Sequence, residues 1–333
     1  MTAKEACHAA ASGLRERYPD AHIVHIPMSD GGEGLVDCIA EAVAADMFSV
    51  KVHNPLMQII EARYAISADG TTAYMEMAAA SGLPLVPKDK RNPMLTTTYG
   101  VGDMILDAVE RGCKKIVMGI GGSATCDGGR GMIDCLADHL PLPVEIIVAS
   151  DVSNPLYGEN GAAYVFAPQK GATPEQVILL DEQLRSFARQ TESRGIALPD
   201  LALHPGAGAA GGLGYGLMAY LGAKLQSGID LLLDTVNFDE QIVDADFILT
   251  GEGKSDKQTL MGKAPEGILK RGKQQSIPVH LLSGAIEDAA YLKKEGFATV
   301  RSINENDPRP LDVLIQKDVA MANMKKTTVN SLI

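Results

Sequence analysis

Apolar and polar residues follow one another in a recurring order: a short β-branched run, a loop rich in Gly, Asp and Ser, and an amphipathic helical stretch. The order is seen three times, in residues 21–45, 114–140 and 246–273. Alternation of strand, loop and helix predicts mainly parallel sheets with helices on both faces. Ligands in such folds bind at the carboxyl ends of strands, so the three loops are the first candidates for chemistry.

The middle of the chain departs from this order. Residues 58–78 contain two strands of period two joined at an Asp-Gly pair, which predicts a hairpin. Residues 174–194 are helix-rich and residues 206–222 are rich in Gly and Ala, and neither segment has an obvious partner strand. We therefore expect an α/β protein of two domains, in which residues 51–234 form an inserted mixed-sheet domain and residues 1–50 plus 235–333 form the other.

Composition supports a two-domain globular protein of the cytoplasm. The 333 residues are 46% hydrophobic, contain no apolar run long enough to span a membrane and show no secretory signal at the start. The net charge of −12 and the lack of a Lys/Arg block argue against nucleic acid as a partner. The five cysteines are scattered without a C-x-x-C pair, which predicts reduced thiols, and no recognisable partner marks Cys126 as a nucleophile.

The loop Gly119–Gly129, with the sequence GIGGSATCDGG, resembles a phosphate cradle. Its glycines let a ligand approach the backbone N–H groups at the start of a helix, and its two hydroxyls add donors. The predicted phosphate contacts are Gly121, Gly122, Ser123, Thr125, Gly128 and Gly129. Asp127 would face the same space as a Mg²⁺ ligand, and the alternative is that Asp127 caps the following helix. No Lys follows at the spacing of a P-loop.

Two further loops carry carboxylates. In SDGGEG, the residues Asp30, Gly31, Gly32 and Glu33 either contact a ligand or form a tight turn in which Asp30 caps a helix. In TGEGKSD, Glu252 and Asp256 stand four residues apart among lysines and are flanked by Gly251 and Gly253. That segment either clamps a metal–phosphate unit or forms an ordinary solvated loop.

Three other features could serve a substrate. Asp151 follows a predicted strand, where it suits a general base or a simple turn, and Lys170 precedes a glycine. The run Gly206–Gly212 matches G-x-G-x-x-G, with Asp230 about twenty residues on, as in an NAD-dependent oxidoreductase. The stretch before that run is bounded by prolines and makes a poor first strand, so a close-packed glycine segment or a substrate loop is favoured.

Taken together, seven motifs in order resemble those of the bacterial type I glycerate kinases: SDGGEG, MEMAAASGL, GIGGSATCDGG, DVSNPL, PQKGA, GAGAAGG and TGEGKSD. The resemblance covers nearly the whole chain. It implies a flavodoxin-like, doubly wound domain interrupted by a second α/β domain. It also implies ATP- and Mg²⁺-dependent phosphorylation of D-glycerate, generally to 2-phosphoglycerate and in some members to 3-phosphoglycerate.

Two departures from the family pattern matter. Members usually begin with a strand that ends in APDS followed by Lys, and this chain begins after that motif. Between Leu140 and Val144, a longer glycine-rich segment is replaced by PLP. These departures keep a non-catalytic paralogue that binds a sugar acid as an alternative, and a homodimer is left open.

The requirements of phosphoryl transfer then suggest roles for the candidates. Phosphate contacts come from Gly121, Gly122 and Ser123, the metal is held by Asp127 or Glu252, and the base is Asp151 or Asp256. The substrate carboxylate needs a cation or a nest of N–H groups. The expected substrate contacts are Lys170, Gly206, Gly208 and the residues 30–33.

Overall fold

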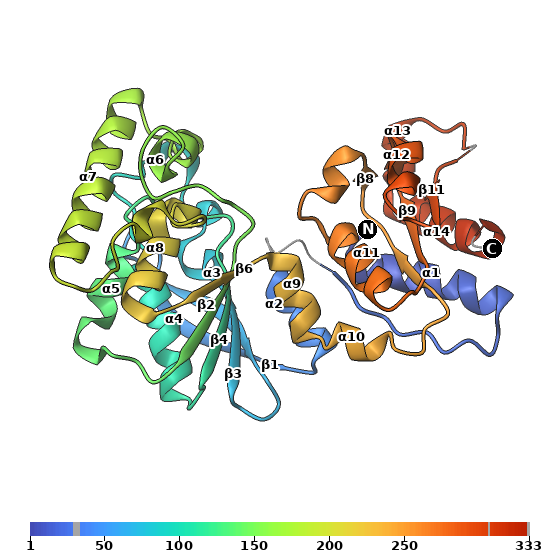
Figure 1. The fold of residues 1–333 in the computed structure, drawn as a ribbon, viewed down its shortest axis with the longest axis horizontal. Coiled ribbons are helices and arrows are strands. Elements are labelled where there is room, and N and C mark those ends of the chain that lie inside the picture. Colours follow the sequence, from blue (N-terminus) through green and yellow to red (C-terminus); the bar gives the residue numbers. More distant parts are fainter. Residues whose placement is uncertain (29–33, 306, 332–333) are drawn as a thin grey trace. The chain divides into compact units, whose positions relative to one another are not determined.

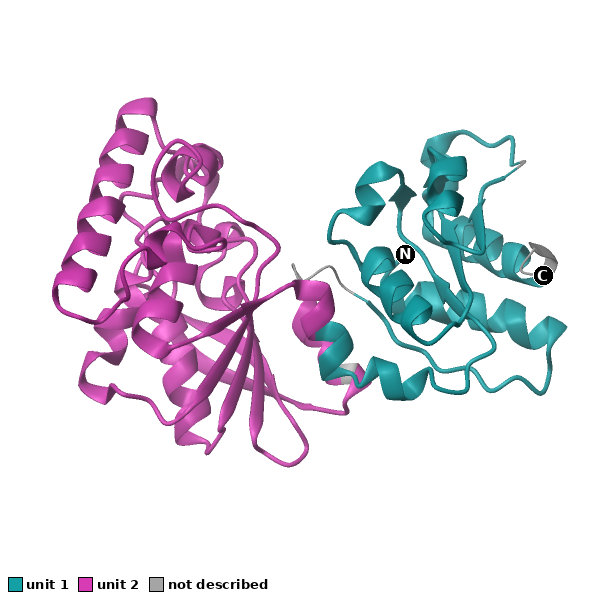
Figure 2. Cartoon of the chain, viewed as in Figure 1, with its two compact units in different colours: residues 1–30, 232–333 teal, residues 31–231 magenta. Residues whose placement is uncertain are grey.

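In the computed structural model, residues 1–28, 34–305 and 307–331 are described, and the chain divides into two compact units. Unit 1 comprises Met1–Asp30 with Leu232–Ile333, and unit 2 comprises Gly31–Leu231 (Figure 2). The first boundary thus falls at residue 30 and not at residue 50, because the helix that begins at Leu35 is tied to unit 2. The backbone N–H of Val36 donates to the Glu76 carboxylate of the unit 2 sheet at 3.0 Å.

Unit 2 is built on one mixed sheet of six strands in the order β1-β2-β3-β4-β5-β6 (Figure 1). The first three strands pair antiparallel, and β3 to β6 pair parallel. The strands are β1 (Asp46–His53), β2 (Ile59–Ile66), β3 (Thr72–Glu76), β4 (Lys115–Gly119), β5 (Glu145–Ala149) and β6 (Lys224–Gln226). The hairpin expected in residues 58–78 is confirmed as β2 and β3, and the predicted mixed sheet is confirmed as well.

The helices of unit 2 lie against this sheet or against one another. They are α2 (Leu35–Ala42), α3 (Ala78–Ser81), α4 (Tyr99–Glu110), α5 (Arg130–Leu136), α6 (Ala162–Phe166), α7 (Pro174–Ser193), α8 (Ala209–Leu221) and the boundary helix α9 (Gly228–Thr235). One core joins the sheet to α4 and α5, where Met104, Ile105, Met118 and Met132 are fully buried. A second core lies between α6, α7 and α8 around Leu184 and Tyr215.

Unit 1 contains a parallel sheet of three strands in the order β11-β9-β7 and a small parallel pair, β8 with β10. The strands are β7 (Ile248–Thr250), β8 (Lys254–Ser255), β9 (Val279–Ser283), β10 (Ala285–Ile286) and β11 (Thr299–Ser302). The helices are α1 (Ala3–Arg17), α10 (Phe238–Gln241), α11 (Ala264–Gln274), α12 (Ala289–Lys294), α13 (Leu311–Leu314) and α14 (Lys317–Ser331). The α/β class with two domains is therefore confirmed.

The two ends of the chain meet inside unit 1, where α1 packs on α14 (Figure 1). Gly13 makes this close packing possible, since a Cβ at that position would lie 1.9 Å from the Thr328 hydroxyl oxygen. At the end of α1, the Arg17 guanidinium donates to the Val329 carbonyl at 2.9 Å. Unit 1 is thus closed by residues more than three hundred positions apart in the sequence.

One predicted strand is wrong. Residues 21–27, with the alternating sequence AHIVHIP, form neither strand nor helix. A strand needs a hydrogen-bonded neighbour, and a groove separates this segment from the edge of β7. The alternation of apolar and polar side chains in residues 21–27 is typical of a strand, but no strand lies close enough to pair with this segment among the described residues.

Candidate functional site

A pocket of about 250 Å³ lies in unit 2 at the carboxyl ends of β3 and β4. It is lined by Glu76, Ala78, Ala79, Pro84, Leu85, Gly119, Gly121 and Gly122. We call it the glycine-loop pocket. Its volume is below the roughly 300–1,000 Å³ typical of sites for drug-sized ligands, so it suits a small acid or one phosphoryl group better than a whole nucleotide.

The glycine loop is held over this pocket by backbone contacts to the segment after β3. Leu83 donates its N–H to the Gly122 carbonyl at 2.8 Å, and Ala124 donates to the Ser81 carbonyl at 2.9 Å. Gly122 has a φ of +72°, a conformation that residues with a Cβ rarely adopt. The structure therefore places Gly121 and Gly122 in the wall of a pocket, and their contact with phosphate stays a prediction.

Glu76 is the carboxylate of this pocket, and it was not among the residues selected from the sequence. It ends β3, and its side chain accepts from the N–H of Val36 at the start of α2. Burial raises the pKa of Glu76, and N–H groups of residues 34–36 act in the opposite direction. The signal that could have found it is a carboxylate that directly follows a strand, the same signal that selected Asp151.

Asp127 lies in the same loop but turns into the protein. Its two carboxylate oxygens accept from the Thr98 N–H at 2.9 Å, the Thr98 hydroxyl at 2.8 Å and the N–H groups of Gly129 and Gly131, both at 3.1 Å. Four donors already surround the carboxylate, at the start of α5. This arrangement favours the capping alternative for Asp127 over the predicted role in metal binding.

Lys170 is also directed into the loop. Its side chain is 3% exposed, and its ammonium group donates to the Ser123 hydroxyl at 2.5 Å and to the Thr125 carbonyl at 2.7 Å. Burial lowers the pKa of Lys170 to about 8. Ser123 and Thr125 are buried with it, so Lys170 fixes the shape of the loop from inside through the Ser123 hydroxyl and the Thr125 backbone carbonyl.

Cys126 is part of this interior arrangement. It is 2% exposed, and burial raises the pKa of its thiol to about 11, so the expectation of an inert thiol agrees with its surroundings. Cys113, Cys126 and Cys135 are free thiols.

The run Gly206–Gly212 packs against the back of the glycine loop. The N–H of Gly128 donates to the Gly211 carbonyl at 3.0 Å, and a Cβ at Gly211 would lie 2.0 Å from the Thr125 carbonyl oxygen. Gly208 is crowded in the same way by the Pro155 carbonyl, and Gly206 by Leu225. These glycines are buried and permit close contact between backbones.

The dinucleotide interpretation of this run lacks its structural context. The fingerprint requires a strand directly before the glycines, whereas the run follows a short 3₁₀ turn over Leu201–Leu203. The close-packed glycine segment is the interpretation that the geometry supports.

Asp151 lies exposed just beyond the end of β5, as the sequence predicts. One of its oxygens accepts from the N–H of Gly228 at 2.9 Å, at the start of α9. The predicted residues Asp30, Gly31, Gly32 and Glu33 lie outside the described residues.

A second polar cluster lies in unit 1 at the carboxyl ends of β7 and β9. One oxygen of Glu252 accepts from the Ser255 hydroxyl at 3.0 Å and from the Thr259 hydroxyl at 2.6 Å, and its other oxygen faces the Lys263 ammonium at 3.5 Å. Ser283, at the end of β9, bonds Ser255 at 2.6 Å. We call these five residues the Glu252 cluster.

The glycines beside this cluster let two loops approach each other. A Cβ at Gly251 would lie 1.8 Å from the Leu282 carbonyl oxygen, and Ala285 donates its N–H to the Gly253 carbonyl at 3.1 Å. Asp256 accepts from the N–H of Gln258 at 2.7 Å and so caps the following short helix. One of its carboxylate oxygens is thereby engaged in the fold.

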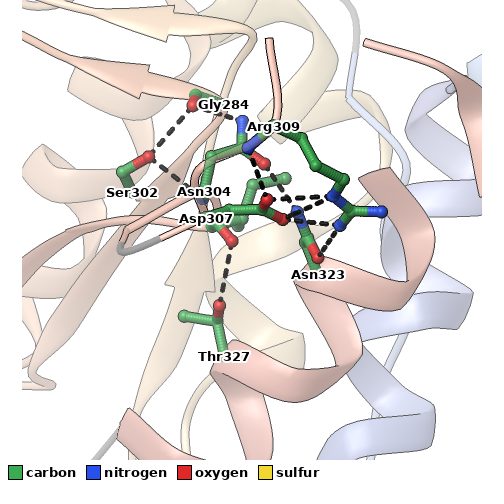
Figure 3. A network of polar contacts seen from close by, with 8 residues as sticks. Gly284, Ser302, Asn304, Asp307, Arg309, Asn323 and Thr327 are labelled. Carbon is green, nitrogen blue, oxygen red and sulfur yellow. Dashed lines mark hydrogen bonds and ion pairs between the residues drawn. The ribbon is translucent and has the colours of Figure 1, made fainter. Parts of the chain in front are cut away.

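Figure 3 shows the polar network that supports the neighbouring turn at Gly284. Ser302 and Asn304 donate to the Gly284 carbonyl at 3.0 and 2.8 Å. Asp307 pairs with Arg309, whose donors hold the pKa of that carboxyl well below its usual range. The network fixes the turn that directly follows Ser283, a member of the Glu252 cluster.

The family model for the glycerate kinase family matches residues 1–141 and 137–332. The chain belongs to the glycerate kinase family. It is 45% identical over 315 residues to a glycerate kinase of Halalkalibacterium halodurans, covering 86% of this chain and 82% of that one. It is 39% identical to the glycerate 2-kinase of Escherichia coli K12, covering 91% and 87%.

A crystal structure assigned to a glycerate kinase 2 of Salmonella typhimurium LT2 is similar in fold to this glycerate kinase family member. It has a TM-score of 0.86 at 36% identity and covers 98% of this chain and 92% of that chain. The family predicted from the seven motifs is therefore confirmed. Among the described residues, no helix is both long and apolar enough to cross a membrane.

Proposed function

We propose that the protein transfers a phosphoryl group from ATP to the 2-hydroxyl of D-glycerate, with Mg²⁺, to give 2-phosphoglycerate. Membership of the glycerate kinase family supports the reaction class. The observation that carries the proposal is the glycine-loop pocket at the carboxyl ends of two parallel strands. Its size suits a small acid, and its loop offers backbone close to the space within.

The two candidate carboxylates for Mg²⁺, Asp127 and Glu252, differ in how many hydrogen bonds their oxygens already accept. Among the described residues no three His, Cys, Asp or Glu side chains converge, but Mg²⁺ in kinases commonly takes one or two carboxylates and completes its shell with phosphate and water. Asp127 already accepts four hydrogen bonds, whereas one oxygen of Glu252 faces only Lys263 at 3.5 Å. We assign the metal to Glu252; when bound, Mg²⁺ would neutralise charge on the transferred phosphoryl group.

The other candidate residues have separate proposed roles. The backbone of Gly121 and Gly122 forms part of the pocket wall. Lys170 keeps the loop in shape through hydrogen bonds to Ser123 and Thr125. Because the ammonium of Lys170 is buried and donates to the loop, we propose that it positions the loop and does not contact the glycerate carboxylate. Asp151 and Asp256 remain the two candidates for accepting the proton of the attacking hydroxyl.

A coupled assay of ADP release with D-glycerate, ATP and Mg²⁺ tests the proposal, with the position of the product phosphate identified by ³¹P NMR. We expect turnover that depends on all three components and a signal for 2-phosphoglycerate. A 3-phosphoglycerate signal would correct the site of transfer. Calorimetric binding of D-glycerate without ADP release would favour the non-catalytic paralogue, and reduction of NAD in place of ADP release would contradict the kinase.

A further inference from the structure

Glu76 supplies the one polar side chain among the described residues that line the glycine-loop pocket, since the others are Ala, Pro, Leu and Gly. It is the last residue of β3 and is paired with Gly119, the last residue of β4. Paired residues of neighbouring strands direct their side chains to the same face of a sheet. Because Gly119 has no side chain, space is left in the pocket beside the Glu76 carboxylate.

The carboxylate of Glu76 accepts hydrogen bonds from the start of α2 and has the capacity for one more. Its Oε1 accepts from the Val36 N–H at 3.0 Å, and the N–H groups of Gly34 and Leu35 also stabilise its charge. A carboxylate has about four positions at which it can accept a hydrogen bond. Three donors therefore leave Glu76 about one position, whereas four donors fill the carboxylate of Asp127.

The glycine loop contributes hydrogen-bond donors to the same pocket. Gly121 and Gly122 are exposed, and within the described part of the chain their N–H groups donate to no protein acceptor. A negatively charged group in the pocket can therefore accept from this backbone. If the same group lay against Glu76, it would meet a like charge, which is unfavourable in a partly buried place.

These two parts of the wall suit different groups of a small hydroxy acid. A negatively charged group suits the glycine loop, whereas a hydroxyl, which can donate a hydrogen bond, suits the carboxylate of Glu76. A hydroxyl turned toward the rest of the wall would lose a hydrogen bond to water without gaining one from a side chain. That apolar part consists of Ala78, Ala79, Pro84 and Leu85.

We propose that Glu76 determines specificity for D-glycerate by accepting a hydrogen bond from its 3-hydroxyl. The inference rests on the proposed function, in which the 2-hydroxyl is the group that reacts. Glu76 thus contacts the substrate and takes no part in proton transfer. An acid without the 3-hydroxyl would leave this acceptor without its partner in the pocket, so it should bind roughly 10–100-fold more weakly.

Titration calorimetry with D-glycerate and D-lactate, with and without Mg²⁺ and ADP, tests the proposal. D-lactate has the same carboxylate and 2-hydroxyl and lacks only the 3-hydroxyl, so the wild type should bind D-glycerate at least tenfold more tightly. In Glu76→Gln, the single amide oxygen accepts from the Val36 N–H and the NH₂ group is left toward the pocket. The ratio of the two affinities should then fall to about threefold or less, whereas a purely structural role would leave it unchanged.

Asp37→Asn is the matched control variant. Asp37 is exposed in the first turn of α2 and lies outside the pocket lining, so the substitution removes a charge near Glu76 without changing the pocket. The ratio of affinities should stay within about twofold of the wild-type ratio. The control ligand 3-hydroxypropionate keeps the 3-hydroxyl, so its affinity relative to D-glycerate should be the same in the wild type and in Glu76→Gln. Circular dichroism melting checks that both variants stay folded.

Several outcomes would overturn the inference: no binding of D-glycerate, equal wild-type affinities for D-glycerate and D-lactate, or a ratio that Glu76→Gln leaves unchanged or Asp37→Asn lowers equally. A change seen with 3-hydroxypropionate and not with D-lactate would place Glu76 at the 2-hydroxyl and overturn it too. Calorimetry requires no phosphoryl transfer, so the two proposals can fail separately. Selective binding that depends on Glu76 without ADP release would contradict only the kinase, and ADP release with a ratio unchanged in Glu76→Gln would contradict only the role of Glu76.

Discussion

The loop Gly119–Gly129 of unit 2 and the loop Gly251–Asp256 of unit 1 have similar compositions, since both combine glycines, at least one hydroxyl and at least one carboxylate after a strand. Their polar groups do different things. In unit 2, Asp127 and Lys170 satisfy buried donors and acceptors of the fold. In unit 1, Glu252 keeps one oxygen toward a partly exposed lysine. The comparison teaches that the partners of a carboxylate, and not its motif, decide whether it can serve a ligand.

The largest expected effect is on activity, through Glu252→Gln. The amide keeps an oxygen for Ser255 and Thr259 but loses the charge assigned to the metal, so kcat should fall roughly 10²–10³-fold. The melting temperature should change by no more than about 2 °C, which thermal denaturation by circular dichroism measures. If Glu252→Gln lost activity because it unfolds, Glu252 would be a structural residue like Asp127, and the proposed difference between the two carboxylates would be wrong.

Asp127→Ala should act in the opposite way, on stability. Four donors lose their acceptor, at about 1 kcal/mol each, so the free energy of unfolding should fall by roughly 3–4 kcal/mol. Calorimetry should show a melting temperature lowered by about 10 °C, since 1 kcal/mol corresponds to about 2–4 °C in a unit of this size. A variant of normal stability that no longer responds to Mg²⁺ would return Asp127 to the metal site.

The seven motifs, the hairpin and the class of fold could be predicted from the sequence because they rest on local patterns and their order. The direction of side chains in the loops could not. Nothing local to residues 119–129 states that Thr98, from another loop, donates to Asp127, or that Lys170 fills the interior behind Ser123. Glu76 offered the local signal of a carboxylate at a strand end, but its contact with Val36, forty positions away, could not be predicted.

Lys170 should make the stability of unit 2 depend on pH. Its pKa in the folded chain is about 8, whereas a lysine in an unfolded chain has a pKa of about 10.4. Between these values the unfolded chain binds more protons, so the contribution of Lys170 to stability rises with pH across this window, by roughly 2–3 kcal/mol. Urea denaturation at pH 7.5 and 10 should show this rise in the wild type relative to Lys170→Met; parallel changes in the two would contradict it.

Ser123→Ala should have a smaller effect. Lys170 loses one of its two acceptors and keeps the Thr125 carbonyl, so stability should fall by about 1 kcal/mol. Ser153→Ala, at an exposed serine of unit 2, is the matched control and should change nothing measurable. If both variants melt together with the wild type, the contact between Lys170 and Ser123 contributes no stability to the loop.

The smallest effect belongs to Cys126. With a thiol pKa of about 11, roughly 0.1% is thiolate at pH 8, and the side chain is buried. Cys126→Ser should therefore keep activity within about twofold, and mass spectrometry after iodoacetamide treatment should find Cys7 and Cys38 alkylated first. Early alkylation of Cys126 would mean that the loop opens far more often than its contacts imply.

The packing of α1 on α14 sets an order for folding during synthesis. Unit 2 is one continuous segment, so all of its core has left the ribosome soon after residue 231 has been added. Residues at the start of unit 1, including Ala9, belong to a core that also contains Ala320 and Met324. Helix α1 must therefore wait, with its apolar side uncovered, until α14 has been translated. During that interval, a folded unit 2 separates two parts of unit 1 that have not yet packed together.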